Sequence, residues 1–215
     1  MNMKKSVNNL TRLCLMVLAF VTLSTSCSKD GIGDNGLSGK SGLSMKVNGE
    51  SWDSWMTTMF TEKHESSEHG EYYLVSLVGS RVIENNSATE DDFAESITMM
   101  IAIPASEFQN SKGTYPIVWE SDVALNQAWA VFGTSTDIRD ATTYGPSPSG
   151  QSGTIEITGF ETGQQTILGQ PTGLEGYTKL SGTFRMELLP LEKTGNTLKI
   201  TEGTFNLKGG MEIGI

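Results

Sequence analysis

The chain has 215 residues, with 15 Lys and Arg against 25 Asp and Glu, a net charge of −10 and 37% hydrophobic residues. This length suits one domain with room for an appendage, and the apolar content argues against wholesale disorder. The acidity argues against a nucleic-acid partner, which basic residues hold by counterion release, and two cysteines are too few for a disulfide scaffold.

Residues 1–26 have the pattern of a secretory signal. Lys4, Lys5 and Arg12 form a basic segment without acidic residues, and an eleven-residue apolar run follows at residues 13–23. A helix needs about 20 apolar residues to cross a bilayer, so this run suits a signal core better than a membrane anchor.

The segment after the run, LSTSC at residues 23–27, resembles the lipobox of bacterial lipoproteins, with Thr25 as a departure from the common pattern. The resemblance implies cleavage before Cys27 and lipid attachment to its thiol. The alternative is an ordinary signal peptide with an incidental cysteine. Cleavage takes three of the 15 basic residues, which leaves 12 against 25 acidic residues and a charge of −13. Cys14 leaves with the signal, so thiol catalysis and thiolate metal ligation are excluded.

Residues 28–42 read SKDGIGDNGLSGKSG and suit a flexible tether. The tether contains a G-x-G-x-x-G match at residues 31–36. A dinucleotide site needs a strand before this motif and a helix after it, and neither is predicted here. We therefore predict a lipidated Cys27 and tether over residues 27–42, a folded domain over residues 43–215, and no cofactor.

From residue 43 onward, apolar residues alternate with polar ones, as half-buried antiparallel strands require. Ile97, Met99, Ile101 and Ile103 share one face. Along residues 180–188 the apolar side chains alternate with an outer set, Ser181, Thr183, Arg185 and Glu187. No helical stripe exceeds two turns, although residues 104–108 suit a single turn. The pattern predicts an all-β domain, a β-sandwich or flattened barrel of about eight to eleven strands.

Turn residues separate these strands. Asn48-Gly49 predicts a hairpin, because both residues accept positive φ, and Glu202-Gly203 suits either a turn or a bulge. Two segments interrupt the alternation: an acidic insertion at residues 84–95 and a Pro/Gly/Ser-rich stretch at residues 134–153, expected to be a long loop.

Several segments together resemble small cell-envelope lipoproteins of Bacteroidota that are grouped as domains of unknown function. They read MKVNGESW (45–52), GTY (113–115), GTIEIT (153–158), LSGTF (180–184) and ITEGTFN (200–206). The resemblance covers most of residues 43–208. It implies a β-rich envelope domain attached to the outer membrane, on its periplasmic or surface face, and transfers no catalytic residue.

Candidate metal ligands are few. His64 and His69 lie five residues apart in a polar segment, a spacing that does not place them on one strand face, so a solvated hairpin tip is the better interpretation than a zinc site. Glu90, Asp91, Asp92 and Glu95 supply oxygen ligands for calcium but lack a fixed spacing. We predict no metal site.

No nucleophile motif or singled-out carboxylate pair indicates an enzyme. Four tryptophans, Trp52, Trp55, Trp119 and Trp129, are candidate ligand contacts if exposed, since aromatic platforms stack sugar rings, although core packing is the ordinary role of tryptophan. The three-residue spacing of Trp52 and Trp55 places them on opposite faces of a regular strand. We expect a non-catalytic, membrane-anchored module that binds a ligand, such as a glycan, or a protein partner. The alternatives are a structural or adhesin-like subunit assembled by strand-edge pairing and an unrecognised hydrolase.

Overall fold

The computed structural model describes residues 42–83, 93–119, 124–135, 141–167, 170–191 and 195–213. These residues form twelve β-strands and one short 3₁₀ helix, η1. The elements are β1 (Leu43–Val47), β2 (Glu50–Asp53), β3 (Met56–Ser66), β4 (Gly70–Ile83), β5 (Phe93–Pro104), η1 (Phe108–Asn110), β6 (Gly113–Val118), β7 (Gln127–Ser135), β8 (Ala141–Gly145), β9 (Gln151–Ile167), β10 (Gln170–Pro190), β11 (Leu198–Lys208) and β12 (Gly210–Ile213). The predicted all-β class is confirmed, with one strand more than the expected range.

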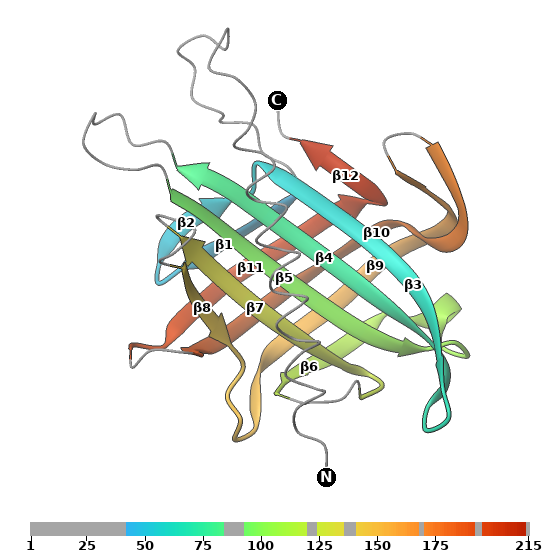
Figure 1. The fold of residues 1–215 in the computed structure, drawn as a ribbon, viewed down its shortest axis with the longest axis horizontal. Helices are drawn as coiled ribbons and strands as arrows, with labels where there is room; N and C mark the ends of the chain where they lie inside the picture. The colour runs from blue at the N-terminus through green and yellow to red at the C-terminus, as the bar shows by residue number, and fades with distance from the viewer. Residues whose placement is uncertain are drawn as a thin grey trace, which may run out of the picture.

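The strands belong to one sheet with the order β12-β3-β4-β5-β7-β6-β9-β10-β11-β1-β2, and β8 pairs with both β7 and β10. All pairings are antiparallel except β6 with β7, which meet in parallel at Ile117 and Ala128. The sheet folds over itself: β3, β4, β5 and β7 form a front layer that crosses β9, β10 and β11 behind it (Figure 1). This arrangement is a flattened barrel with the core between its two layers.

The alternation seen in the sequence sorts the side chains between core and surface. In β5, Ile97, Met99, Ile101 and Ile103 are fully buried, and β10 contributes Leu180, Phe184, Met186 and Leu188 from the opposite layer. Because successive strand residues point to opposite faces, each strand presents one apolar row inward. The inward rows form one continuous core.

Two turn predictions are resolved by backbone geometry. Asn48 and Gly49 have φ values of 51° and 93°, and Val47 pairs with Glu50, so the hairpin is confirmed. Glu202, at φ 53°, lies inside the continuous strand β11, where the pairing with β1 and with β10 shifts by a residue. The segment Glu202-Gly203 is therefore a bulge rather than a turn.

Two segment predictions need correction. The stretch expected as a long loop at residues 134–153 contains the end of β7, the strand β8 and the start of β9. Ala141, Thr142 and Thr143 of β8 pair with β7, and the turn-forming residues around them do not predict this strand. The acidic insertion is also shorter than expected, because β5 already begins at Phe93 and includes Glu95.

Candidate functional site

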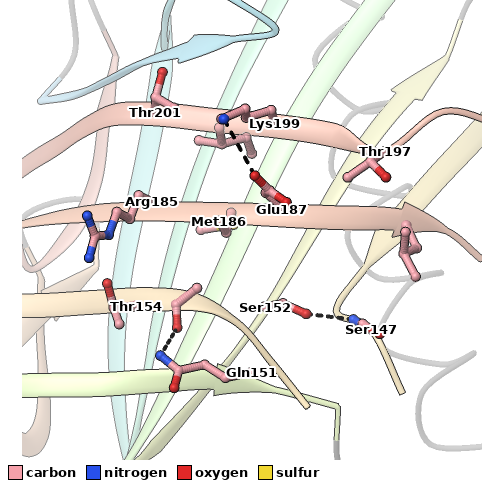
Figure 2. Close-up of a pocket in the computed structure, with 13 residues that line it drawn as sticks. Ser147, Gln151, Ser152, Thr154, Arg185, Met186, Glu187, Thr197, Lys199 and Thr201 are labelled. Carbon is pink, nitrogen blue, oxygen red and sulfur yellow. Dashed lines mark hydrogen bonds and ion pairs between the residues drawn. The ribbon is translucent and has the colours of Figure 1, made fainter. Parts of the chain in front are cut away.

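The outer surface of the back layer contains a groove over the start of β9, the end of β10 and the start of β11 (Figure 2). It encloses about 650 Å³ and is open to solvent. Its lining is mainly polar: Ser147, Gln151, Ser152, Gly153, Thr154, Arg185, Met186, Glu187, Leu189, Thr197, Lys199, Ile200 and Thr201. The groove lies on the polar face that the alternation of residues 181–187 predicts.

Strand register explains why the groove lies here. Arg185 pairs with Thr154 of β9, but on its other side the pairing of β10 with β11 skips from Phe184 to Met186. The β11 bulge therefore lies opposite Arg185, and such a bulge bends the strand and changes the direction of its side chains. Gly153 allows β9 to approach closely, since a Cβ there would collide with the Arg185 carbonyl oxygen and with Met186.

Most polar groups of the groove already have partners. Lys199 Nζ lies 3.6 Å from Glu187 Oε1, Gln151 Nε2 donates to the Gly153 carbonyl at 2.9 Å, and the Ser147 amide donates to Ser152 Oγ at 2.6 Å (Figure 2). Within the described residues, the exposed Arg185 guanidinium has no ion-pair partner. Arg185 is therefore the cation available to a ligand, with threonine hydroxyls on the neighbouring strands.

A second polar cluster closes one end of the core. Glu95 Oε2 accepts hydrogen bonds from Arg81 Nε at 2.7 Å and from Trp52 Nε1 at 2.8 Å. The Arg81 guanidinium carbon lies 5.5 Å from the centre of the Trp52 ring. Glu95 is thus held in a largely buried ion pair, which opposes the calcium alternative considered for this acidic segment; Glu90, Asp91 and Asp92 lie outside the described residues.

A third cluster contains buried tyrosines near η1. Tyr177 Oη lies 2.5 Å from Ser111 Oγ, and Tyr115 Oη donates to the Ser111 carbonyl at 2.7 Å. Burial raises the pKa of Tyr115 to about 12 and raises the pKa of Tyr177 as well, although the hydrogen bond with Ser111 opposes the second shift. Both tyrosines are neutral at physiological pH and act as structural hydrogen-bond donors.

The four tryptophans do not gather at the groove. Trp52 is fully buried and forms part of the core, so it does not meet the condition of exposure that a ligand contact requires. Trp55, Trp119 and Trp129 are half-buried, and none of them lines the groove. Trp129 projects from the outer face of β7 and pairs across the strands with Met100. Stacking of a sugar on tryptophan is therefore not a feature of this groove.

The histidines lie where the sequence places them, at the hairpin between β3 and β4. The His64 ring stacks against the Tyr72 ring, with ring centres 5.4 Å apart, and His64 Nε2 lies 3.3 Å from Glu62 Oε2. Within the described ranges, no group of three or more His, Cys, Asp or Glu side chains is arranged to hold a metal ion.

The predicted signal, Cys27 and residues 28–41 of the tether lie outside the described residues; Gly42 accepts a hydrogen bond from Asn206 of β11. The part of the chain that the structure describes contains no helix of sufficient length and apolarity to cross a membrane. Comparison with protein-family models, with curated proteins and with solved structures finds no match to this chain.

The sequence does not predict the groove. The alternation of residues 181–187 predicts that Arg185 points outward, but its lack of an ion-pair partner among the described residues depends on the register between β10 and β11. The sequence signal that bears on this register is Glu202-Gly203, which suits a bulge and a turn equally.

Proposed function

We propose that this protein is a lipid-anchored cell-envelope module that binds a hydroxyl-rich anionic ligand, such as an acidic glycan, in the groove of β9, β10 and β11. The observation that supports the proposal most directly is Arg185, an exposed guanidinium without an ion-pair partner among the described residues, beside Thr154 and opposite the bulge that includes Thr201. Guanidinium groups bind carboxylates through two parallel hydrogen bonds, and hydroxyl and amide groups complement sugar hydroxyls.

The same lining favours binding over catalysis. Glycoside hydrolysis uses two carboxyl groups separated by about 5 to 9.5 Å. Glu187 is the carboxylate among the described lining residues, and Lys199 lies beside it. The groove is also open to solvent, whereas catalytic sites exclude water around the reacting atoms.

Strand-edge assembly receives less support from the fold. The strands at the two ends of the sheet, β2 and β12, are each four residues long. Short terminal strands limit pairing with another chain, so we place ligand recognition on a sheet face rather than on an edge.

The lipid anchor is tested at Cys27. In a bacterial host that processes lipoproteins, radiolabelled palmitate should be incorporated into the unsubstituted chain and into Ser28→Ala, but not into Cys27→Ala. The reason is that the thiol of Cys27 is the proposed attachment atom. Palmitate incorporation into Cys27→Ala would contradict the anchor and leave the ligand proposal standing.

The ligand proposal is tested by titration calorimetry with polygalacturonate as the acidic probe and dextran as the neutral one. We expect binding of the acidic probe that weakens with salt, because exposed charges are screened. Arg185→Ala should weaken binding tenfold or more, equivalent to about 1.4 kcal/mol.

Lys179→Ala is the matched control, since Lys179 also projects from β10 but pairs with Glu161 at 2.8 Å outside the groove. It should leave the affinity within twofold. Equal losses in both variants would assign binding to net charge rather than to the groove, and an unsubstituted chain that binds neither probe would contradict the proposal.

A further inference from the structure

The groove of β9, β10 and β11 contains an ion pair of unusual geometry for this layer. Lys199 Nζ lies 3.6 Å from Glu187 Oε1. The ion pair of Lys179 with Glu161, outside the groove, closes at 2.8 Å and is also a hydrogen bond. A separation of 3.6 Å is too long for a hydrogen bond. The attraction between Lys199 and Glu187 therefore rests on charge alone.

Both side chains of this loose pair face solvent. The Lys199 side chain is 62% exposed and the Glu187 side chain is 61% exposed. Exposed ion pairs contribute little to stability, since water and salt screen the charges and both side chains lose conformational freedom. Separating Lys199 from Glu187 therefore costs little, and the ammonium group is available to a different anion.

The backbone of Lys199, in contrast, is fixed. Asn48, at the turn between β1 and β2, donates from its amide to the Lys199 carbonyl at 2.8 Å, and Asn48 Oδ1 accepts from the Lys199 amide at 2.9 Å. Lys199 also pairs with Glu187 in the register of β10 and β11. The ammonium group can therefore change its partner while the strand that positions it stays in place.

Strand register brings Lys199 close to Arg185. Glu187 lies directly opposite Lys199, and Arg185 is two residues before Glu187 on the same face of β10. Diagonal cross-strand neighbours of this kind are separated by about 7 to 8 Å. Figure 2 shows Arg185 and Glu187 along β10, with Lys199 reaching toward Glu187 from β11. Two cations thus lie within reach of one ligand molecule.

The groove is a local exception to the acidity of the chain. The whole chain has 15 basic residues against 25 acidic ones, but the described lining contains two cations, Arg185 and Lys199, against the single carboxylate of Glu187. Glu202, at the adjacent bulge, is already held by Lys46 at 2.8 Å. Glu187 is therefore the carboxylate of the lining that competes with an anionic ligand for Lys199.

We propose that Glu187 is an internal competitor in this groove and that the ligand carries at least two acidic groups, an inference that rests on the proposed function. Arg185 binds the first acidic group, and the second displaces Glu187 from Lys199. A ligand with one acidic group gains only the contact with Arg185. An acidic polymer supplies both groups, because its charges recur along the chain.

The competitor increases discrimination between these two classes of ligand. Every anion that enters the groove is repelled by the Glu187 carboxylate, but only a ligand with two acidic groups gains the compensating contact with Lys199. Specificity is a difference between two binding free energies, and a repulsive group built into a site enlarges that difference. Glu187 and Lys199 are therefore specificity-determining residues for an acidic polymer.

The first test uses a water-soluble carbodiimide, which joins a carboxylate and a neighbouring amine as an amide with loss of water. The protein is purified from a host that processes lipoproteins. Without ligand, peptide mass spectrometry should detect one amide between Glu187 and Lys199 and another between Glu161 and Lys179. Saturating trigalacturonate, a fragment of the polygalacturonate probe, should abolish most of the first amide and attach to Lys199, while the second amide persists.

The second test measures the affinity for trigalacturonate by calorimetry. Glu187→Gln should raise the affinity about threefold, because it removes the competitor, and Lys199→Ala should lower it about threefold, as expected for an exposed ion pair. Glu161→Gln is the matched control, since it removes the same charge from the same layer outside the groove. It should leave the affinity nearly unchanged. Circular dichroism checks that each variant retains its β-structure.

Three results would overturn the inference. They are a Glu187–Lys199 amide that persists in saturating trigalacturonate, an unchanged affinity in Lys199→Ala, and equal gains from Glu187→Gln and Glu161→Gln, which would assign the effect to net charge. If Arg185→Ala still weakens the binding of polygalacturonate, the proposed function stands and only the roles of Glu187 and Lys199 are wrong. An unsubstituted chain that binds neither acidic probe overturns both.

Discussion

At the scale of single residues, the buried tyrosines connect the fold to pH. Tyr115 and Tyr177 both lie against Ser111, where burial disfavours the phenolate. Because burial raises the pKa of Tyr115 to about 12, the native state retains a proton that an unfolded tyrosine releases near pH 10. The stability that depends on this proton is fully present below about pH 10 and is lost as the pH rises toward about 12.

We predict that the free energy of unfolding falls between pH 10 and 12, and that it falls less steeply in Tyr115→Phe. Each tyrosine contributes up to about 1.4 kcal/mol per pH unit to the slope. Urea unfolding at several pH values measures the slope, and the same variant at pH 8 gives the separate cost of the lost hydrogen bond. Identical slopes for Tyr115→Phe and the unsubstituted chain would rule out this linkage.

The sequence predicted some residue environments and missed others. The buried row of β5 follows from local alternation alone. Trp52 and Trp55 were expected on opposite faces of a regular strand, but β2 ends at Asp53 and Ser54 hydrogen-bonds to the Leu43 carbonyl, so the strand rule does not reach Trp55. The sequence also does not predict the ion pair of Glu95 with Arg81, because that pair depends on the pairing of β4 with β5.

At the scale of secondary-structure elements, one side chain connects the two layers. Gln165 of β9 is 5% exposed; its Oε1 accepts from the Thr61 amide at 2.9 Å, and its Nε2 donates to the Thr61 carbonyl at 2.7 Å. The Tyr177 amide donates to Thr61 Oγ1 at 3.2 Å. The Gln165 side chain therefore bonds to the backbone of β3 as a neighbouring strand would, and this contact joins β9 to β3 across the two layers.

Gln165→Ala should destabilise the protein by about 2 to 4 kcal/mol, because it leaves the buried amide and carbonyl of Thr61 without these partners. Thermal unfolding measures the effect as a drop of about 2 to 4 °C for each kcal/mol. Gln164→Ala is the matched control, since Gln164 is the exposed neighbour on the same strand, and it should change stability by less than about 0.5 kcal/mol. Similar losses in the two variants would argue against the closing role of Gln165.

Element predictions succeeded where the signal was local. Asn48-Gly49 specifies its hairpin through backbone conformation, and the alternating strands follow from periodicity. The strand β8 was missed because its ATTYG sequence lies within turn-forming residues, and its stability comes from pairing with β7 and β10. Bulge and turn at Glu202-Gly203 use the same residues, so only the partner strands distinguish them.

At the scale of the whole molecule, the front layer carries apolar side chains on both surfaces, but its two surfaces have different energetic roles. Leu77 is fully buried in the core between the layers, whereas the next residue, Val78, lies half-buried on the outer surface of the layer. These adjacent residues of β4 allow the core to be tested separately from the outer surface.

Leu77→Ala should cost about 2 to 5 kcal/mol, because it leaves a cavity in the core that the two layers share. Val78→Ala should cost clearly less under dilute conditions, because its side chain is only half-buried by its own chain. Thermal unfolding, followed by circular dichroism, compares the two variants. The midpoint temperature should fall far more in Leu77→Ala than in Val78→Ala. A larger effect from Val78→Ala would mean that the layer packs against its own chain on both sides.

The sequence by itself determined the all-β class, the inward rows of the strands and the Asn48-Gly49 hairpin, because each depends on residues that are neighbours along the chain. The tertiary structure alone decided the position of the Arg185 groove, the burial of Trp52 and the pairing of Glu95 with Arg81. These features depend on strand order and register, which bring together residues such as Thr61 and Gln165 that are far apart in sequence. Local periodicity specifies which way a side chain points, and only the pairing of distant strands specifies what it meets there.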